Sequence, residues 1–318
     1  MDKDNFRIVF MGTPEFAQES LLRIIEEGFN VAAVITAPDK PSGRGRKLQE
    51  SAVKKFANQK NLLVLQPTNL KDTIFLRELK NLKADLNVVV AFRMLPEAVW
   101  DMPKKGTINL HASLLPDYRG AAPINRAIMN GEQKSGVTTF LIEKEIDTGN
   151  ILLSEEVDIS DKMNAGDLHD ILMEKGAKLL TDTIYRMISG DIVSVPQQKS
   201  THLKLALKIH PEDCRIPWEN DVQSIYNHIR GLSPYPGAWT EIQIANGEKF
   251  SLKIFSAAYE KESHSFGTPT IIKDTNKEFR ISVPGGYIQI LELQMPGKKK
   301  MNIQDFLRGN SIDEWEIL

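Results

Sequence analysis

The chain has 318 residues, of which 41% are hydrophobic and 26% are charged, and its formal net charge is −2. The length favours two domains that each bury a core, and the composition is that of an ordinary soluble protein. The single cysteine, Cys214, excludes an internal disulfide. No apolar run approaches the roughly 18 residues of a membrane-spanning helix, and no signal peptide is evident. We therefore expect a cytoplasmic protein without a membrane partner.

The first predicted strand is the apolar run 6–11, followed at once by Gly12, Thr13 and Pro14. Thr followed by Pro is typical of a helix start, so we expect Thr13 as the N-cap and Pro14 as the first helical residue. Apolar residues at helical spacing extend this helix to about Glu27. Strand, turn and helix indicate a nucleotide-type α/β unit, but one glycine is not G-x-G-x-x-G, which argues against a dinucleotide site.

A second predicted strand, 31–37, leads into a basic segment. Residues 39–55 contain six Lys or Arg and two acidic residues, a local excess of four positive charges. One interpretation is an exposed, solvated loop. The other is a nucleic-acid finger, in which glycines let the chain follow a groove while Arg44, Arg46 and Lys47 meet phosphates.

The next segments continue the α/β alternation. We expect a helix over 51–59, a strand over 62–65, a helix from Thr68 to about Leu82, and a strand over 86–92 that is apolar throughout and therefore central.

Two polar side chains stand out in the short strand that follows Gly106. Residues two apart on a strand share a face, so Asn109 and His111 point the same way as Thr107. Polar groups on an otherwise apolar strand need partners or cost about 1 to 3 kcal/mol each. A partnered core histidine is one interpretation; a catalytic pair is the other. Asp147, at a Gly turn after the apolar run 137–142, is a plausible partner.

The remaining pattern predicts the second half of the fold. We expect helices over 123–130 and 164–188, with a strand over 151–159 between them. After a Gly/Pro-containing linker come a helix over 222–230 and five short strands, near 238–245, 250–258, 268–273, 279–283 and 286–293. The predicted fold is a Rossmann-like, mostly parallel sheet with helices on both faces, plus a small OB-like β-barrel. The predicted limits are 1–189 for the first domain, 190–208 for the linker and 209–318 for the barrel.

The stretch Asn-Leu-His-Ala-Ser-Leu-Leu-Pro at 109–116, with Tyr-Arg-Gly at 118–120 and Ile-Asp-Thr-Gly at 146–149, resembles the folate-dependent formyltransferases. The resemblance implies that Asn109, His111 and Asp147 form the catalytic group. It also implies that the turn made by Ser113, Leu114, Leu115 and Pro116 lies beside the formyl-folate, and that Phe16 lines the pocket for the accepting aminoacyl group.

Further motifs resemble the branch of that family that acts on methionyl-tRNA. The basic Gly-rich stretch 43–47 looks like the insertion of that branch that reaches the tRNA acceptor end, and stretches 233–239, 297–301 and 305–309 look like its C-terminal domain. The resemblance implies transfer of formyl from 10-formyltetrahydrofolate to initiator methionyl-tRNA, without a metal, by a monomer. Arg93 stands where the family commonly has glycine, in a loop that is one residue shorter.

Alternatives remain open at this point. The same trio would serve a formyltransferase acting on glycinamide ribonucleotide or a sugar nucleotide, or a formyl-folate hydrolase. A tRNA- or folate-binding module without catalysis is the alternative from a different class.

Overall fold

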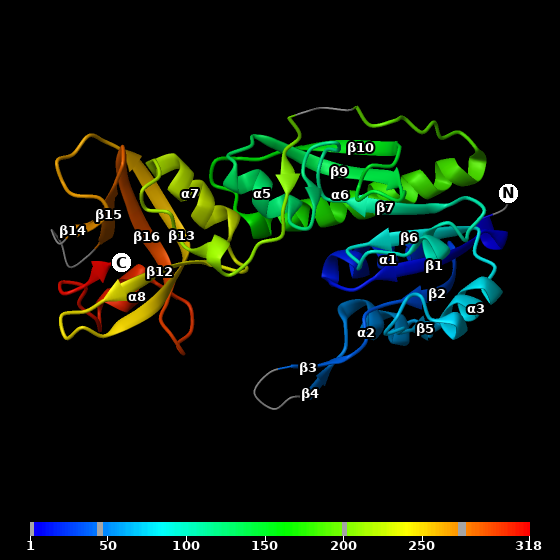
Figure 1. Ribbon diagram of the computed structural model, residues 1–318, viewed down its shortest axis with the longest axis horizontal. Helices are drawn as coiled ribbons and strands as arrows, with labels where there is room; N and C mark the ends of the chain where they lie inside the picture. Colours follow the sequence, from blue (N-terminus) through cyan, green and yellow to red (C-terminus); the bar gives the residue numbers. More distant parts are fainter. Residues whose placement is uncertain (1–2, 43–46, 199–201, 273–277) are drawn as a thin grey trace. The chain divides into compact units, whose positions relative to one another are not determined.

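Figure 1 shows the computed structural model of the protein. The structure describes residues 3–42, 47–198, 202–272 and 278–318. The chain forms two compact units. Unit 1 comprises Met1–Gly120, Ser135–Val157 and Asp170–Leu205, and unit 2 comprises Ala121–Lys134, Asp158–His169 and Ala206–Leu318. The domain limits predicted above, which treat each domain as one continuous stretch, stay a prediction.

Seven strands form the main sheet of unit 1, in the order β10-β9-β7-β6-β1-β2-β5. They are β1 (Arg7–Gly12), β2 (Asn30–Ile35), β5 (Val64–Leu65), β6 (Leu86–Val90), β7 (Thr107–His111), β9 (Lys134–Leu141) and β10 (Ile151–Asp158). The pairs from β7 to β5 are all parallel, whereas β9 is antiparallel to β7. The predicted mostly parallel sheet is confirmed, with β6 buried at its centre.

Helices cover both faces of this sheet, as predicted. They are α1 (Glu15–Glu26), α2 (Ala52–Gln59), α3 (Thr73–Asn81), α4 (Glu97–Trp100) and α6 (Ala165–Ser189). Val9 and Val89, on one face, share a buried cluster with Phe75 of α3. On the other face, Leu110 of β7 packs closely against Gly176 of α6. The alternation of strand side chains therefore builds two apolar layers from one set of strands.

Two predicted helix starts were wrong. Pro14 keeps an extended ψ of −178°, so helix α1 begins at Glu15 with Pro14 as an N-cap that makes no side-chain hydrogen bond, and Thr13 does not cap it. Helix α3 begins at Thr73 rather than Thr68, because the Asp72 carboxylate accepts hydrogen bonds from the free N–H groups of residues 74 and 75. At α3 the Asp72 side chain thus takes the place of the predicted cap.

The basic segment is a hairpin at its base rather than a plain loop. Strands β3 (Lys40–Ser42) and β4 (Lys47–Gln49) pair in an antiparallel manner and project from the rest of unit 1 (Figure 1). Below them, Lys54 lies 2.5 Å from Asp39 and 3.0 Å from Glu50. Both acidic residues of the segment 39–55 thus form ion pairs with the same lysine at the base of the hairpin.

Unit 2 holds the predicted barrel. Its antiparallel sheet has the order β14-β15-β16-β13-β12-β18, with β17 on β16, and its edge strands β14 and β18 approach each other. The strands are β12 (Ala238–Gln243), β13 (Lys249–Lys261), β14 (Thr270–Ile272), β15 (Phe279–Val283), β16 (Gly286–Gln294), β17 (Met301–Asn302) and β18 (Glu316–Ile317). Helices α5 (Pro123–Met129), α7 (Val222–Gly231) and α8 (Ile303–Leu307) complete the unit. The nearly closed sheet confirms the small barrel, and all five predicted strands are present.

Within the part of the chain that the structure describes, no helix combines the length and apolar character needed to cross a membrane.

Candidate active site

Strand β7 presents two polar side chains on one face of the unit 1 sheet. Asn109 is paired with Val89 of β6, so both side chains project to the face where Val89 packs against α3 and α4. His111, two residues on, points to the same face at the carboxyl end of the strand. The carboxyl edge of a parallel sheet is where α/β folds place their sites, because the loops that follow the strands open there.

His111 is held by a backbone carbonyl. Its side chain is only 7% exposed, and its Nε2 lies 2.8 Å from the carbonyl oxygen of Tyr118. A carbonyl only accepts hydrogen bonds, so Nε2 carries the hydrogen and donates it. In the neutral ring Nδ1 therefore keeps its lone pair, and the ring is oriented so that this nitrogen faces Asp147. Phe140 stands edge-on to the imidazole at a centroid distance of 6.5 Å.

Asp147 completes the arrangement from a different part of the chain. Its Oδ2 lies 3.9 Å from His111 Nδ1 and accepts a hydrogen bond of 2.9 Å from the N–H of Gly120. The separation from His111 is long for a hydrogen bond but short enough for a strong Coulomb interaction, since both groups are largely buried. One carboxylate oxygen thus faces both the imidazole and the 118–120 segment that holds the imidazole.

The route of the chain to Asp147 is indirect. Because β9 is antiparallel to β7, with Leu141 opposite Ile108 and Thr138 opposite His111, the chain leaves β9 about three residues, or roughly 10 Å, from His111. The loop after β9 must therefore fold back over the sheet to bring Asp147 beside the imidazole. Neither the alternation of apolar and polar residues nor the turn residues in the sequence predict that this loop folds back.

Two residues at the site have strained backbones. Tyr118 and Asp147 both have left-handed φ angles, +60° and +54°, which cost non-glycine residues about 1 to 3 kcal/mol each. Tyr118 is fixed by its N–H, which donates to the carbonyl of Lys204 over 2.5 Å. Strained residues persist when their surroundings hold them, and they cluster at sites that depend on accurate placement.

Asn109 offers an unused amide. It is partly buried, and its side chain makes no hydrogen bond to any residue that the structure describes. An amide with two free N–H donors, on the strand face that His111 shares, can donate to a developing oxyanion.

The turn at 113–116 is rigid and closes directly after the site strand. Ser113 is fully buried, and its hydroxyl donates to the carbonyl of Asp117 over 2.7 Å. The Thr138 hydroxyl donates to the Ser113 carbonyl and accepts from the N–H of Leu115. Leu115 is buried, while Leu114 and Pro116 are partly exposed. Thr138 was not among the predicted residues, and no pattern in the sequence links it to this turn.

The other predicted residues lie elsewhere in unit 1. Phe16 is buried in the first turn of α1, beside the carboxyl end of β1. Arg44 and Arg46 lie outside the described residues, and Lys47 begins β4. The hydrogen bond, ion pair and ring contact of His111 given above involve neither Phe16 nor the hairpin.

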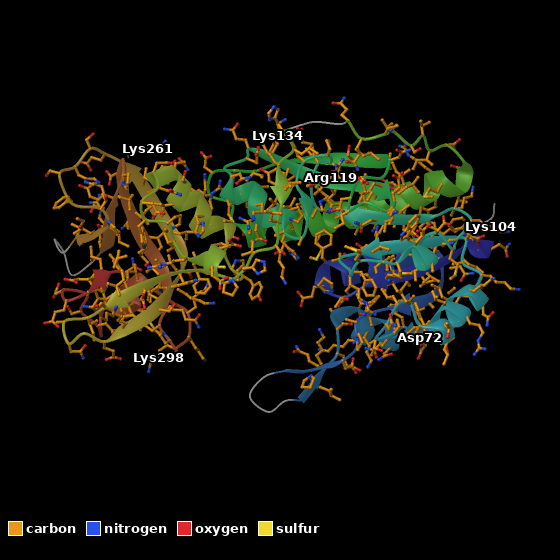
Figure 2. The ribbon with its side chains drawn as sticks, in the orientation of Figure 1. Asp72, Lys104, Arg119, Lys134, Lys261 and Lys298 are labelled. Atoms are coloured by element: carbon orange, nitrogen blue, oxygen red, sulfur yellow. The ribbon has the colours of Figure 1, made fainter. Side chains whose placement is uncertain are left out.

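A further residue at the site was missed by the sequence reasoning. The Gln197 amide donates to the carbonyls of Asp147 and Gly149, over 2.9 and 2.8 Å. Gln197 lies in the stretch predicted as a linker, where a single polar residue carries no recognisable signal. Arg119, which belongs to the Tyr-Arg-Gly motif and is labelled in Figure 2, donates to the Gln197 side-chain oxygen.

The sequence matches two families of known protein domains. Residues 6–184 match the family described as formyl transferase, and residues 208–311 match the formyl transferase C-terminal domain.

Relatives match along almost the whole length. A protein of Flavobacterium johnsoniae called methionyl-tRNA formyltransferase is 51% identical over 306 residues, which cover 96% of each chain. A protein of the same name from Bacteroides thetaiotaomicron is 47% identical over 312 residues, which cover 97% of each chain.

Solved structures show the same fold at lower identity. An N-formyltransferase from Helicobacter canadensis, in complex with folinic acid and dTDP-3-aminofucose, has a TM-score of 0.65 at 23% identity and covers 90% of this chain and 98% of its own. HypX from Aquifex aeolicus, in complex with tetrahydrofolic acid, has a TM-score of 0.64 at 18% identity and covers 96% of this chain and 47% of its own. With most of the chain matched by these two families and relatives near half identical over almost its whole length, the chain belongs to the formyl transferase family.

Proposed function

We propose that the protein transfers the formyl group of 10-formyltetrahydrofolate to the amino group of initiator methionyl-tRNA, with Asn109, His111 and Asp147 as its catalytic residues. The observation that carries the proposal is the position of the Asp147 carboxylate 3.9 Å from His111 Nδ1, in a fold whose relatives bear the name methionyl-tRNA formyltransferase.

The reaction needs three things from the site. The amine nitrogen attacks the formyl carbon, and the carbonyl electron pair moves to oxygen. The tetrahedral intermediate then collapses, the bond from the carbon to the folate nitrogen breaks, that nitrogen takes up a proton, and the amine loses one. An oxyanion donor, a proton carrier and a group that stabilises positive charge are therefore required.

The three side chains suit these tasks. The free amide of Asn109 is suited to donate to the oxyanion. His111 has its lone pair on Nδ1, because Nε2 donates to Tyr118, so Nδ1 is the atom that accepts and returns a proton. Asp147 stabilises the imidazolium by Coulomb attraction across 3.9 Å.

The substrate contacts in this proposal follow the family resemblance. The turn made by Ser113, Leu114, Leu115 and Pro116 would bind the formyl-folate, and Phe16 would line the aminoacyl pocket. The basic hairpin with Arg44, Arg46 and Lys47 would bind tRNA phosphates. The relatives near half identical favour a tRNA acceptor over a small molecule.

The test is formyl transfer from 10-formyltetrahydrofolate to charged initiator methionyl-tRNA by wild type and by Asn109→Ala, His111→Ala and Asp147→Ala. We expect wild type to transfer rapidly and each variant to lose about 10²-fold or more in kcat, the usual size for loss of an oxyanion or proton-transfer group. Folate binding, measured by equilibrium dialysis, should persist in all variants.

His169→Ala is the matched control, because it removes an imidazole on helix α6 and should keep wild-type kcat. If wild type binds formyl-folate but leaves methionyl-tRNA unformylated, the acceptor is a small molecule or water. Wild-type activity in His111→Ala would rule out the assigned roles.

A further inference from the structure

Gln197 connects both halves of the candidate active site although it lies about fifty residues beyond Asp147 in the chain. Its Nε2 donates to the carbonyls of Asp147 and Gly149, over 2.9 and 2.8 Å. Its Oε1 accepts from the Arg119 guanidinium, at 3.1 Å from Nε and 2.6 Å from the terminal nitrogen. One amide therefore joins the loop that carries Asp147 to the segment next to Tyr118 and Gly120.

The position of Gln197 follows from strand register. Ile151, the first residue of β10, forms an antiparallel bridge with Val195, and each donates its N–H to the other's carbonyl over 2.8 Å. In an antiparallel pair, two residues forward on one strand lie opposite two residues back on the other. Gln197 is therefore held opposite Gly149, at the end of the loop that has folded back over the sheet.

The orientation of the amide is determined by its neighbours. A guanidinium only donates hydrogen bonds, so the oxygen of Gln197 must face Arg119 and the nitrogen must face the two carbonyls. All polar atoms of the amide are used in this way. Both carbonyls that it binds flank the turn in which Asp147 has its left-handed φ of +54°.

The 118–120 segment is the other end of the same connection. Tyr118 accepts from His111, Gly120 donates to Asp147, and Arg119 between them binds Gln197. A shift of the Asp147 turn would therefore change the distance between the carboxylate and the imidazole.

We propose that Gln197 is a positioning residue that holds Asp147 against His111 for formyl transfer. This inference rests on the proposed function, because it assigns Asp147 a part in that reaction. Gln197 itself contacts the backbone of the Asp147 turn and the Arg119 side chain, and it acts through them.

The first experiment compares Gln197→Ala and Gln197→Glu with the matched control Gln198→Ala, which removes the same side chain from the exposed neighbouring position. We expect kcat of both Gln197 variants to fall about tenfold to hundredfold, as a displacement of about 1 Å at a site does. The KM values for formyl-folate and methionyl-tRNA should stay within about twofold. Gln197→Glu keeps the acceptor for Arg119 but loses the donor, so it should resemble Gln197→Ala.

A double-mutant cycle and a spectroscopic readout complete the test. If Gln197 acts through Asp147, adding Gln197→Ala to Asp147→Asn should lower kcat by less than about twofold further, because the two residues act as one unit. In ¹⁵N-histidine spectra, the His111 ring signals should shift in Gln197→Ala and stay unchanged in Gln198→Ala.

The outcomes separate the two proposals. Raised KM with unchanged kcat, or equal losses in Gln197→Ala and Gln198→Ala, would overturn the positioning role. An inactive wild type with His111 signals that still respond to Gln197→Ala would overturn the acceptor assignment alone, while supporting the structural link. If wild type is active, and Gln197→Ala changes neither kcat nor the His111 signals, the positioning role of Gln197 alone would be overturned.

Discussion

At the residue scale, the orientation and the hydrogen-bonding state of the His111 ring are set by residues outside its own strand. The carbonyl of Tyr118 fixes which ring nitrogen carries hydrogen, and Asp147 faces the other nitrogen. The strand alone determines only the face to which the imidazole points. The tautomer and the charge environment come from two loops with strained backbones, so the chemical state of His111 is a property of the folded site.

His228, in unit 2, supports a prediction about stability and pH. It is buried, and burial is the main cause that lowers its pKa below the ordinary value, with the nearby Arg126 lowering it further. Its Nε2 has no hydrogen-bond partner among the described residues. His228 therefore takes up its proton at a lower pH in the folded protein than in the unfolded chain, where the ordinary pKa is about 6.5.

Unfolding below that pH takes up a proton, so the free energy of unfolding should fall as the pH drops below about 6.5. We expect His228→Phe to flatten this dependence, measured as Tm from about pH 8 to about pH 5. His210→Phe, at an exposed position of the same unit, is the control and should keep the wild-type slope. Parallel curves for wild type and His228→Phe would contradict the prediction.

At the element scale, the hairpin of β3 and β4 concentrates positive charge. Asp39 accepts hydrogen bonds from Lys54 and Gln66, which lower the pKa of its carboxyl, and Glu50 pairs with the same lysine. Both acidic side chains of the segment thus pair with Lys54, below the two strands.

We expect the triple variant with alanine at Arg44, Arg46 and Lys47 to raise the KM for tRNA and to leave folate binding intact. The slope of log KM against log salt should become shallower by about 0.7 to 0.9 for each phosphate that the variant no longer neutralises. The control replaces three exposed lysines outside the hairpin, Lys80 of α3 and Lys104 and Lys105 before β7; Lys104 is labelled in Figure 2. If the slope of log KM against log salt is equal in wild type and in the hairpin variant, the hairpin does not bind tRNA phosphates and is an ordinary solvated segment.

The loop between β6 and α4 is anchored by the residue that departs from the family pattern. The Arg93 guanidinium donates to the carbonyls of Thr68, over 2.9 Å, and Pro67, in the loop after β5. It also lies over the Phe92 ring, 5.6 Å from its centroid. Arginine thus ties together two loops at the carboxyl edge of the sheet.

Arg93→Gly should free this loop and raise the KM for formyl-folate about threefold to tenfold, which corresponds to about 1 kcal/mol, with little change in kcat. Arg93→Lys keeps the charge but not the forked geometry, so it should give a smaller rise in the same direction. An unchanged folate KM in Arg93→Gly would show that the anchored loop does not contact the folate.

At the scale of the whole molecule, each unit is built from three separate stretches of the chain. This organisation predicts how stable a fragment is when one stretch is expressed without the others. In unit 2, the buried Arg230 donates to the carbonyls of Ser160 and Met163, and the Tyr226 hydroxyl donates to that of Asp161. A fragment of residues 209–318 lacks these acceptors. Each buried donor left unsatisfied costs about 1 to 3 kcal/mol.

We therefore expect the 209–318 fragment to unfold at lower temperature and less cooperatively than the same strands in the full chain, as followed by amide hydrogen exchange. Arg230→Met supplies a test of the cause, because it should stabilise the fragment while destabilising the full chain. A fragment as stable as the full chain would support the continuous domain limits predicted from the sequence.

The sequence by itself determined the features that depend on neighbouring residues. Period-two and helical spacing located the parallel strands, the long α6 helix and all five barrel strands that we expected, because the side chains that alternate between faces are close in the chain. The same periodicity put Asn109 and His111 on one face. The motif around 109–120 indicated the family, which the comparisons confirm.

Only the tertiary structure decided the features that depend on register between distant segments. The antiparallel direction of β9, the return of the Asp147 loop to His111, and the placement of Gln197 opposite Gly149 all follow from pairings between strands far apart in sequence. The pattern of one strand does not specify which strand pairs with it or in which direction, and a lone glutamine in a polar stretch carries no periodicity. Candidate site residues can thus be recognised locally, whereas the contacts that orient them are set by the packing of the whole unit.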